Sequence, residues 1–369
     1  MGGRKLKNLY TLLTLGLSAV LIVLAPWNVS AEPGDWAKNT EVKGDIRLRY
    51  QMDKVEGKAD RSRGRARARV GFESEVNDKV KVGIGLASGG ADSRSTNQTF
   101  EDAFSSKGIN LDLAYVEVAL AEPATLFGGK FASKEVLWHP SDLLWDGDIT
   151  VEGGGVVLKV NPFFLNLAGF VLDENKAGAD PALYAAQPGI KIKAGNLTIN
   201  GAVAYYAFSN LKGAGFLPNS AETNSDSVGD GSGVLIYEYD AIVPNIEVSM
   251  DDLGALPHAA VFGEYVNNSD PSSEHSGYVF GFKVGDKKVK AAKQWQFKYL
   301  FRSLEKDAWP DFLSDSDFAG GGTGFEGHEV MLDIGLAKNV VLGLDYYKTE
   351  PIQGSVNQEV FQIDMVTKF

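Results

Sequence analysis

The residues best suited to chemistry in this sequence are arginines that recur at every second position. Arg63, Arg65, Arg67 and Arg69 alternate with small or apolar residues at positions 64, 66, 68 and 70. A guanidinium group keeps its charge at physiological pH, and its planar fork of donors matches a carboxylate or a phosphate. The run could therefore interact with anionic groups, provided that all four side chains face the same way.

Further charges share the parity of this run. Glu73 continues it, and Arg47 and Arg49 follow Asp45 on an earlier segment. We call the six arginines at 47, 49, 63, 65, 67 and 69 the basic wall. Two interpretations remain open: the arginines set the electric field inside a pore, or they only neutralise neighbouring carboxylates such as Glu73 and brace the wall.

Metal and catalytic sites receive little support. The four histidines, His139, His258, His275 and His328, show none of the close spacings of zinc ligands. Asp146-Gly147-Asp148 and Asp315-Ser316-Asp317 do not complete a calcium-binding loop. The absence of cysteine excludes thiolate metal sites, covalent haem attachment and a cysteine nucleophile. We expect no cofactor, no bound metal and no enzymatic activity.

The elements that must position these residues alternate with period two from about residue 44 to the C-terminus. Apolar and aromatic residues at 278, 280, 282 and 284 alternate with Val279, Gly281 and Lys283. In the same way, Phe361, Ile363 and Met365 alternate with Gln362 and Asp364. Such alternation is typical of strands that separate two different environments. Because one face is strongly apolar and the other strongly polar, a membrane barrel with a wet lumen fits better than a soluble sandwich or barrel.

The connections between these strands alternate in length. Short turns are expected at 77–78, 121–124, 161–162, 194–196, 286–288 and 338–339. Longer polar segments are expected at about 52–62, 88–108, 132–148, 173–181, 209–230, 267–275, 305–327 and 349–356. This predicts an all-β, transmembrane, antiparallel up-and-down barrel with short periplasmic turns and long extracellular loops. The count is about sixteen strands, although residues 240–260 are hard to divide.

Membrane energetics decide the orientation of the basic wall. An arginine facing lipid at the membrane midplane would cost roughly 2–4 kcal/mol, and several would exceed the whole stability of a typical protein. A register slip of one residue would reverse both faces. The basic wall should therefore face the lumen.

The first 31 residues resemble a cleaved signal peptide. Arg4, Lys5 and Lys7 precede an apolar stretch that runs to about Pro26, and a small-residue cleavage pattern ends at Ala31. An uncleaved anchor is the alternative, since the stretch approaches the length of a spanning helix. Removal of residues 1–31 leaves a barrel at 32–369 with 33 basic and 48 acidic side chains, a net charge of −15. Such a charge makes nucleic acid an unsuitable partner.

Several motifs resemble the bacterial family of putative porins. They are Gly44-Asp45-Ile46-Arg47-Leu48-Arg49-Tyr50, the arginine run with Val70-Gly71-Phe72-Glu73, the segments 95–100 and 111–116, and 144–148 with 151–153. The terminal Phe369, on an amphipathic strand, is similar to the assembly signal of outer-membrane proteins. The resemblance implies a sixteen-stranded, multi-pass pore in the bacterial outer membrane, passive transport and a homotrimer, but no particular substrate.

By analogy with such pores, the third long connection, about 131–148, would fold into the lumen and narrow it. Its carboxylates Glu135, Asp142, Asp146 and Asp148 would then stand opposite the basic wall and create a transverse field. The alternative is an exposed loop whose tryptophans lie at the membrane interface.

The leading hypothesis is a porin for passive diffusion of small polar solutes or ions through a water-filled lumen, in contact with outer-membrane lipid and lipopolysaccharide. The acidic loops favour cations and the basic wall favours anions, and we expect the narrowest part to select small polar, anionic or zwitterionic solutes. Two alternatives remain: a barrel that serves as a scaffold for a partner such as an electron carrier, and an outer-membrane lipid hydrolase with a Ser/His/acid group at the rim.

Overall fold

Strands dominate the chain from one end of the described region to the other. The computed structural model describes residues 39–214 and 235–369, so the signal peptide expected at 1–31 lies outside the described residues. Among the described residues, no helix has both the length and the apolar character needed to cross a membrane.

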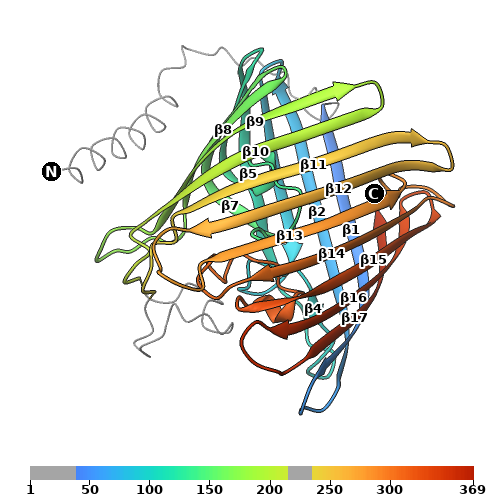
Figure 1. Cartoon of the computed structure of the whole chain (residues 1–369). Coiled ribbons are helices and arrows are strands. Elements are labelled where there is room, and N and C mark those ends of the chain that lie inside the picture. Colours follow the sequence, from blue (N-terminus) through green and yellow to red (C-terminus); the bar gives the residue numbers. More distant parts are fainter. Residues whose placement is uncertain (1–38, 215–234) are drawn as a thin grey trace.

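Sixteen long strands occur in these two ranges (Figure 1). They are β1 (Thr40–Val55), β2 (Arg61–Asn77), β3 (Val80–Ser88), β5 (Ile109–Ala121), β6 (Ala124–Ala132), β7 (Thr150–Val160), β8 (Phe163–Val171), β9 (Ala182–Ala194), β10 (Leu197–Ser209), β11 (Ala241–Leu253), β12 (Leu256–Asn268), β13 (Ser276–Gly285), β14 (Trp295–Leu304), β15 (Phe325–Ala337), β16 (Val340–Pro351) and β17 (Gln358–Lys368). The short strand β4 (Gln98–Thr99) and the 3-10 turns η1 (Ser133–Glu135) and η4 (Ala319–Gly321) lie in long connections.

Each long strand pairs antiparallel with its neighbours, and β1 closes the sheet by pairing with β17. At this seam the backbones of Gly44 and Phe369 exchange two hydrogen bonds of 3.0 Å. A Cβ atom at Gly44 would lie 2.5 Å from the Phe369 ring, so this position favours a residue without a side chain. The predicted closed barrel of sixteen strands is confirmed.

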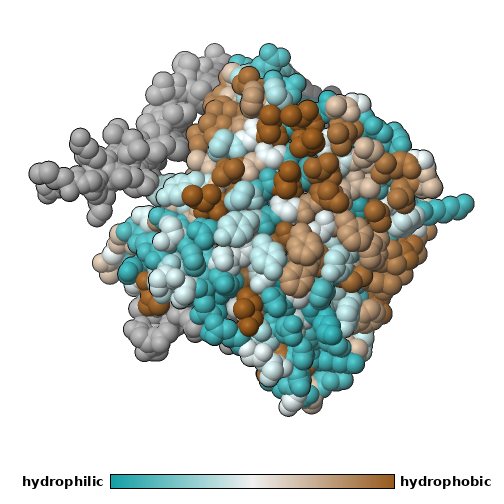
Figure 2. Space-filling model, in the orientation of Figure 1, coloured by the Kyte–Doolittle hydropathy of each residue, from teal (hydrophilic) through white to brown (hydrophobic). Residues whose placement is uncertain are grey.

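The two faces of the wall differ as the alternation predicts. On β1 the outward Ile46 and Leu48 are 50% and 45% exposed, whereas the inward Asp45 and Arg49 are 7% and 5% exposed. Figure 2 shows hydrophobic side chains gathered over the strands and hydrophilic ones toward the long connections. On β1 the charged residues Asp45 and Arg49 therefore lie on the inner face of the barrel, and the aliphatic residues Ile46 and Leu48 lie on the outer face.

One predicted turn is wrong. The turn expected at 286–288 is a longer segment, 286–294, between β13 and β14. The Gln294 side chain accepts hydrogen bonds of 2.8 Å from the backbone of Lys290 and Ala291. Residues in the segment also bond to the β15–β16 turn, where Asn339 N donates to Lys290 O. These bonds fold the extra residues against the barrel wall.

The interior wall is not polar all the way round. On β9, β11, β12 and β14 the inward residues Leu183, Val243, Val266 and Leu300 are fully buried. They belong to one apolar cluster with Leu143, Leu144, Trp145, Trp309, Phe312 and Leu313, which lie in the connections 133–149 and 305–324. Both connections are therefore packed inside the barrel. The expectation of a polar inner face along every strand is wrong on this side, because inserted loops cover the wall there.

Candidate functional site

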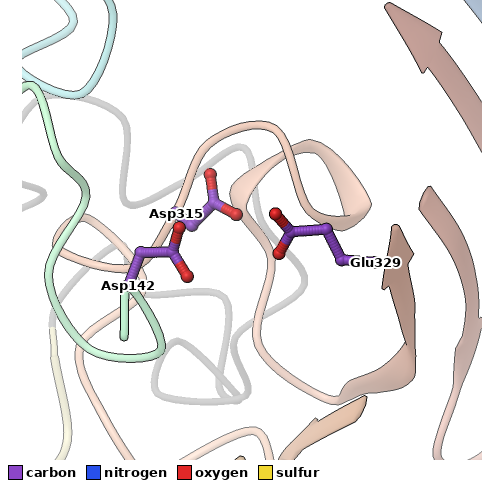
Figure 3. A group of neighbouring side chains, drawn as sticks. All are labelled: Asp142, Asp315 and Glu329. Atoms are coloured by element: carbon purple, nitrogen blue, oxygen red, sulfur yellow. The ribbon is translucent and has the colours of Figure 1, made fainter. Parts of the chain in front are cut away.

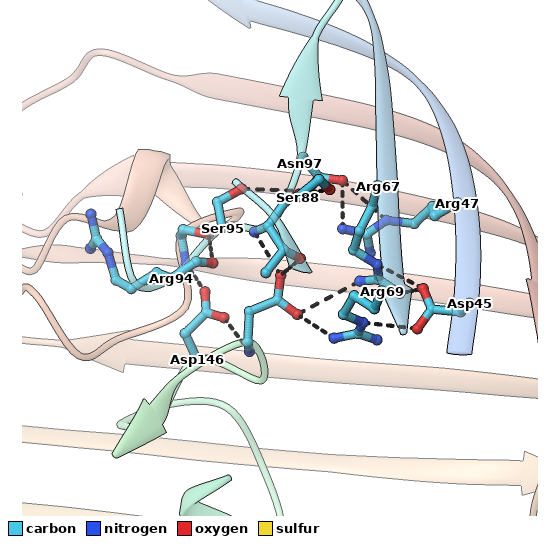
Figure 4. Close-up of polar contacts among 12 residues, drawn as sticks. Asp45, Arg47, Arg67, Arg69, Ser88, Arg94, Ser95, Asn97 and Asp146 are labelled. Carbon is cyan, nitrogen blue, oxygen red and sulfur yellow. Dashed lines mark hydrogen bonds and ion pairs between the residues drawn. The ribbon is translucent and has the colours of Figure 1, made fainter. Parts of the chain in front are cut away.

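Two arginines of the basic wall share carboxylates at the middle of β2 (Figure 4). Arg67 lies 2.7 Å from one oxygen of Asp45, and Arg69 lies 2.8 Å from the other. Asp148 approaches the same two arginines at 3.6 and 3.3 Å. It also accepts hydrogen bonds from the backbone and hydroxyl of Thr96. Asp148 therefore ties the third long connection to the basic wall.

Arg49 forms the most enclosed ion pair of the wall. Its Nε and Nη2 donate to the two carboxylate oxygens of Asp364 at 2.7 Å, and its Nη1 lies 2.8 Å from Asp317. The neighbouring Arg47 donates to the side-chain oxygen of Asn97 at 2.8 Å and lies 3.8 Å from Asp364. Such bidentate pairs fix the guanidinium plane as well as its charge.

The remaining wall residues are less uniformly paired. Arg63 lies 2.8 Å from Asp53. Arg65 donates to the neutral groups of Gln51 at 3.0 Å and Ser95 at 3.3 Å. Among the described residues, no carboxylate oxygen lies within 4.0 Å of a guanidinium nitrogen of Arg65. Glu73, nearer the periplasmic end, pairs with Lys43 at 2.7 Å. The bracing interpretation thus accounts for most of these charges, but not for Arg65.

Of the four carboxylates expected opposite the basic wall, only Asp148 contacts it. Asp146 accepts hydrogen bonds of 2.8 Å from the backbone of Asp148 and Ser316. Asp142 lies 3.9 Å from Lys298 on β14, away from the basic wall. Glu135 is exposed in η1. The alternation pattern could not supply this outcome, since loop side chains follow no fixed period.

A second inserted connection, 305–324, lies within the segment 305–327, which the sequence predicts only as a long polar connection. Trp309 Nε1 donates to Leu144 O at 2.7 Å, and the backbone N of Asp146 donates to Leu313 O at 2.8 Å. Its apolar content, Trp309, Phe312, Leu313 and Phe318, was the available signal that it packs inside. The two connections thus form a single body inside the lumen.

A third connection, 89–108, completes this body through Arg94. The Arg94 guanidinium donates to Asp311 O at 2.6 Å and Gly321 O at 3.1 Å, and its carbonyl accepts from Ser316 Oγ at 3.1 Å. The ion pair of Arg49 with Asp317 joins the same place to β1. We call Arg94, Ser316 and Asp317 the partition.

Two cavities meet at the partition, because both are lined by its three residues. The outer cavity, about 500 Å³, lies toward the extracellular β1–β2 connection. Its charged lining residues are Asp53, Lys54, Lys58, Arg61, Arg63, Arg65, Asp92, Arg94, Asp317 and Glu359. The inner cavity has a volume of about 240 Å³. Its charged lining residues are Arg47, Arg49, Arg94, Asp142, Asp146, Asp148, Asp315, Asp317, Glu329, Asp333, Asp345 and Asp364.

The family model described as putative porin matches residues 54–232 and 237–369. The chain belongs to this family. A comparison with curated proteins finds no match.

Solved structures agree with the fold of this porin. It is similar to OprB of Pseudomonas putida at high pH, with 10% sequence identity, a TM-score of 0.61 and coverage of 90% of this chain and 95% of that chain. It is also similar to a triple mutant of the Rhodopseudomonas blastica porin, with 11% identity, a TM-score of 0.50 and coverage of 89% and 100%. At such identities the similarity shows the fold alone.

The carboxylates around the partition of this porin differ from one another in pKa. Burial raises the pKa of Asp315 to about 8, and the neighbouring charge of Asp142 acts in the same direction. Burial, together with Asp315, also raises the pKa of Asp146. Burial alone would raise the pKa of Asp317 as well, but the adjacent Arg49 outweighs it and lowers that pKa to about 2. Part of the acidic charge therefore varies with pH above neutrality, and part is fixed.

Three carboxylates of the porin come together beside the inner cavity. One oxygen each of Asp142, Asp315 and Glu329 lies within 4.8 Å of the others (Figure 3). Oxygen donors of this kind suit calcium or magnesium. However, Lys298 lies 3.3 Å from Glu329, and Arg302 lies 3.4 Å from Asp315. These cations compensate the group, so ion pairing accounts for its geometry without a metal.

The hydrolase alternative gains no support from His139 and Ser141. Ser141 Oγ donates to Glu264 at 2.6 Å, and His139 Nδ1 lies 2.8 Å from the backbone oxygen of Ser141. A catalytic triad requires the imidazole to contact the serine hydroxyl. In this porin the hydroxyl is bonded to the carboxylate instead.

Proposed function

We propose that this outer-membrane porin passes small polar solutes and ions by passive diffusion, and that cations pass more readily than anions. The path runs from the outer cavity past the partition into the inner cavity. The observation that carries the cation preference is the lining of the inner cavity, where nine carboxylates accompany three arginines.

This preference differs from the expected preference for small anionic or zwitterionic solutes, which rested on the basic wall governing the narrowest part of the pore. Arg47, Arg49, Arg67 and Arg69 each lie within 4.0 Å of a carboxylate. An ion pair contributes little net field at a distance. Asp333 and Asp345 line the inner cavity and lie in no ion pair among the described residues, so they leave the cavity with an acidic excess. The pKa values of Asp317 and Asp148 are lowered, because nearby arginines outweigh the effect of burial: Arg49 at Asp317, and Arg67 with Arg69 at Asp148. The negative charge of both carboxylates therefore persists into acidic solution.

The proposal includes the route to the membrane. The positive start and apolar stretch of residues 1–31 support export by a cleaved signal peptide. The outward aliphatic and aromatic residues support contact with outer-membrane lipid and lipopolysaccharide. The inserted connections 133–149 and 305–324 support a lumen narrowed on one side.

Conductance of the purified protein in planar bilayers under a potassium chloride gradient tests the proposal. We expect discrete current steps and a reversal potential of the sign produced by cation preference. Steps with anion preference would overturn the selectivity. Absence of steps from a protein whose folded barrel is verified by circular dichroism would overturn the channel itself.

A further inference from the structure

The two cavities carry opposite charge. Six basic and four acidic side chains line the outer cavity, whereas three basic and nine acidic side chains line the inner cavity. A solute that crosses the partition therefore leaves a basic region and enters an acidic one. This sequence of fields favours a solute that carries both signs of charge.

In the outer cavity, Arg65 has donors to offer. Its contacts are with the neutral Gln51 through Nη1 and the neutral Ser95 through Nη2, and each of these nitrogens carries a second N–H. A guanidinium group carries five N–H donors in a fork that matches a carboxylate. Arg65 is thus suited to bind the carboxylate of a solute.

In the inner cavity, Asp345 offers the complementary group. It is an inward residue of β16 that lines the inner cavity, and its Oδ1 has no hydrogen-bond partner. Among the described residues, no lysine or arginine lies within ion-pair distance of its carboxylate. Asp345 is thus suited to accept hydrogen bonds from an ammonium group.

The registers of the barrel place these two residues close enough to act on one solute. Asp345 pairs with Gln362 on β17, Gln362 pairs with Gln51 on β1, and Arg65 lies two residues from the β2 partner of Gln51. Three strand spacings and two residues correspond to roughly 16 Å between the two Cα atoms, a gap that inward side chains shorten. Arg49 and Asp317 are charged neighbours of both residues.

We propose that the solutes this porin binds best are small zwitterions, with the carboxylate on Arg65 in the outer cavity and the ammonium on Asp345 in the inner cavity. This inference rests on the proposed channel function. It differs from general cation preference, because it requires a basic and an acidic contact at the same time.

Inhibition of the potassium current by 5-aminopentanoate at pH 8 tests the inference, with pentylammonium and pentanoate as single-charge controls. We expect the zwitterion to inhibit at a concentration about tenfold lower than either control, since a second charged contact is gained. Equal inhibition by pentylammonium and 5-aminopentanoate would overturn the inference.

Variants assign the two contacts. Arg65→Gln should reduce inhibition by 5-aminopentanoate to the level of pentylammonium and leave pentylammonium unchanged. Asp345→Asn should weaken both. Lys58→Gln removes a basic charge from the same outer cavity and should leave the zwitterion's advantage intact; loss of the advantage in this control would indicate a general field rather than a site. Conductance and reversal potential without any solute verify the channel separately in each variant.

Discussion

The two halves of the lumen wall use the same strand geometry for different purposes. On β1, β2 and β17 the inward positions carry Arg49, Arg67 and Asp364, and their charges are held in ion pairs that face the cavities. On β9 to β14 the inward positions carry Leu183, Val243 and Leu300, which the inserted connections cover. One half therefore holds the inserted connections 133–149 and 305–324 in the lumen through apolar burial, and the other half leaves a polar passage beside them.

The largest effect should come from replacing Trp309, which packs against the apolar half of the lumen wall. Its ring is buried and lies 5.0 Å from Tyr206 and 6.1 Å from Trp145, measured between ring centroids. Trp309→Ala should remove about 3–5 kcal/mol of packing and release the connection 305–324 from the lumen. We expect higher conductance and cleavage of this connection by added protease, with the barrel strands still intact.

Phe104→Ala is the matched control for Trp309, since Phe104 is an aromatic residue in another long connection and is fully exposed. Its conductance and protease pattern should equal those of the unaltered protein. An unaltered conductance in Trp309→Ala would mean that apolar packing does not hold the connection 305–324 in the lumen.

The next effect should come from the polar half. Replacing Arg65, Arg67 and Arg69 together by Gln removes three positive charges from the lumen and should increase cation preference, measured as the reversal potential. Replacing the exposed Lys287, Lys288 and Lys290 by Gln removes the same charge near the periplasmic turns. This control should change the reversal potential much less; equal shifts would show that net charge, not its place, governs selectivity.

A smaller effect should appear with pH. Because the pKa of Asp315 is raised to about 8 by burial and by Asp142, this carboxyl is neutral at pH 6 and ionised at pH 9. Cation preference should therefore rise with pH, with a midpoint near 8. Asp315→Asn should remove this step from the reversal potential. Persistence of the same step in that variant would assign the titration to another group.

The smallest effect should come from Glu135→Gln. Glu135 belongs to the inserted connection but is exposed in η1, and it contacts no residue of the basic wall. We expect the reversal potential to stay within the scatter of the unaltered protein. A shift as large as that of Asp148→Asn would mean that the whole acidic connection acts on the passage, regardless of contact.

The barrel was predictable from the sequence because period-two alternation is a property of each strand alone. The same rule oriented Arg47 and Arg67 toward the lumen before any contact was known. Asp148, which lies two residues before β7, was expected opposite the basic wall only by analogy with porins whose third long connection folds into the lumen. It could not place Asp142 or reveal the partition, because Arg94, Ser316 and Asp317 meet through three connections whose backbones follow no repeating pattern. Loop contacts depend on tertiary packing, and the apolar residues Trp309, Phe312, Leu313 and Phe318 were the available signal of it.

The seam between Gly44 and Phe369 bears on the order of events in biogenesis. The residues that close the barrel stand 325 positions apart in the chain, as their numbers show, so the decisive pairing is the least local contact available. Non-local contacts form slowly. Until β17 arrives, the free edge of β1 exposes unpaired backbone groups to any other strand, so β1 is where wrong strand pairing would start during assembly.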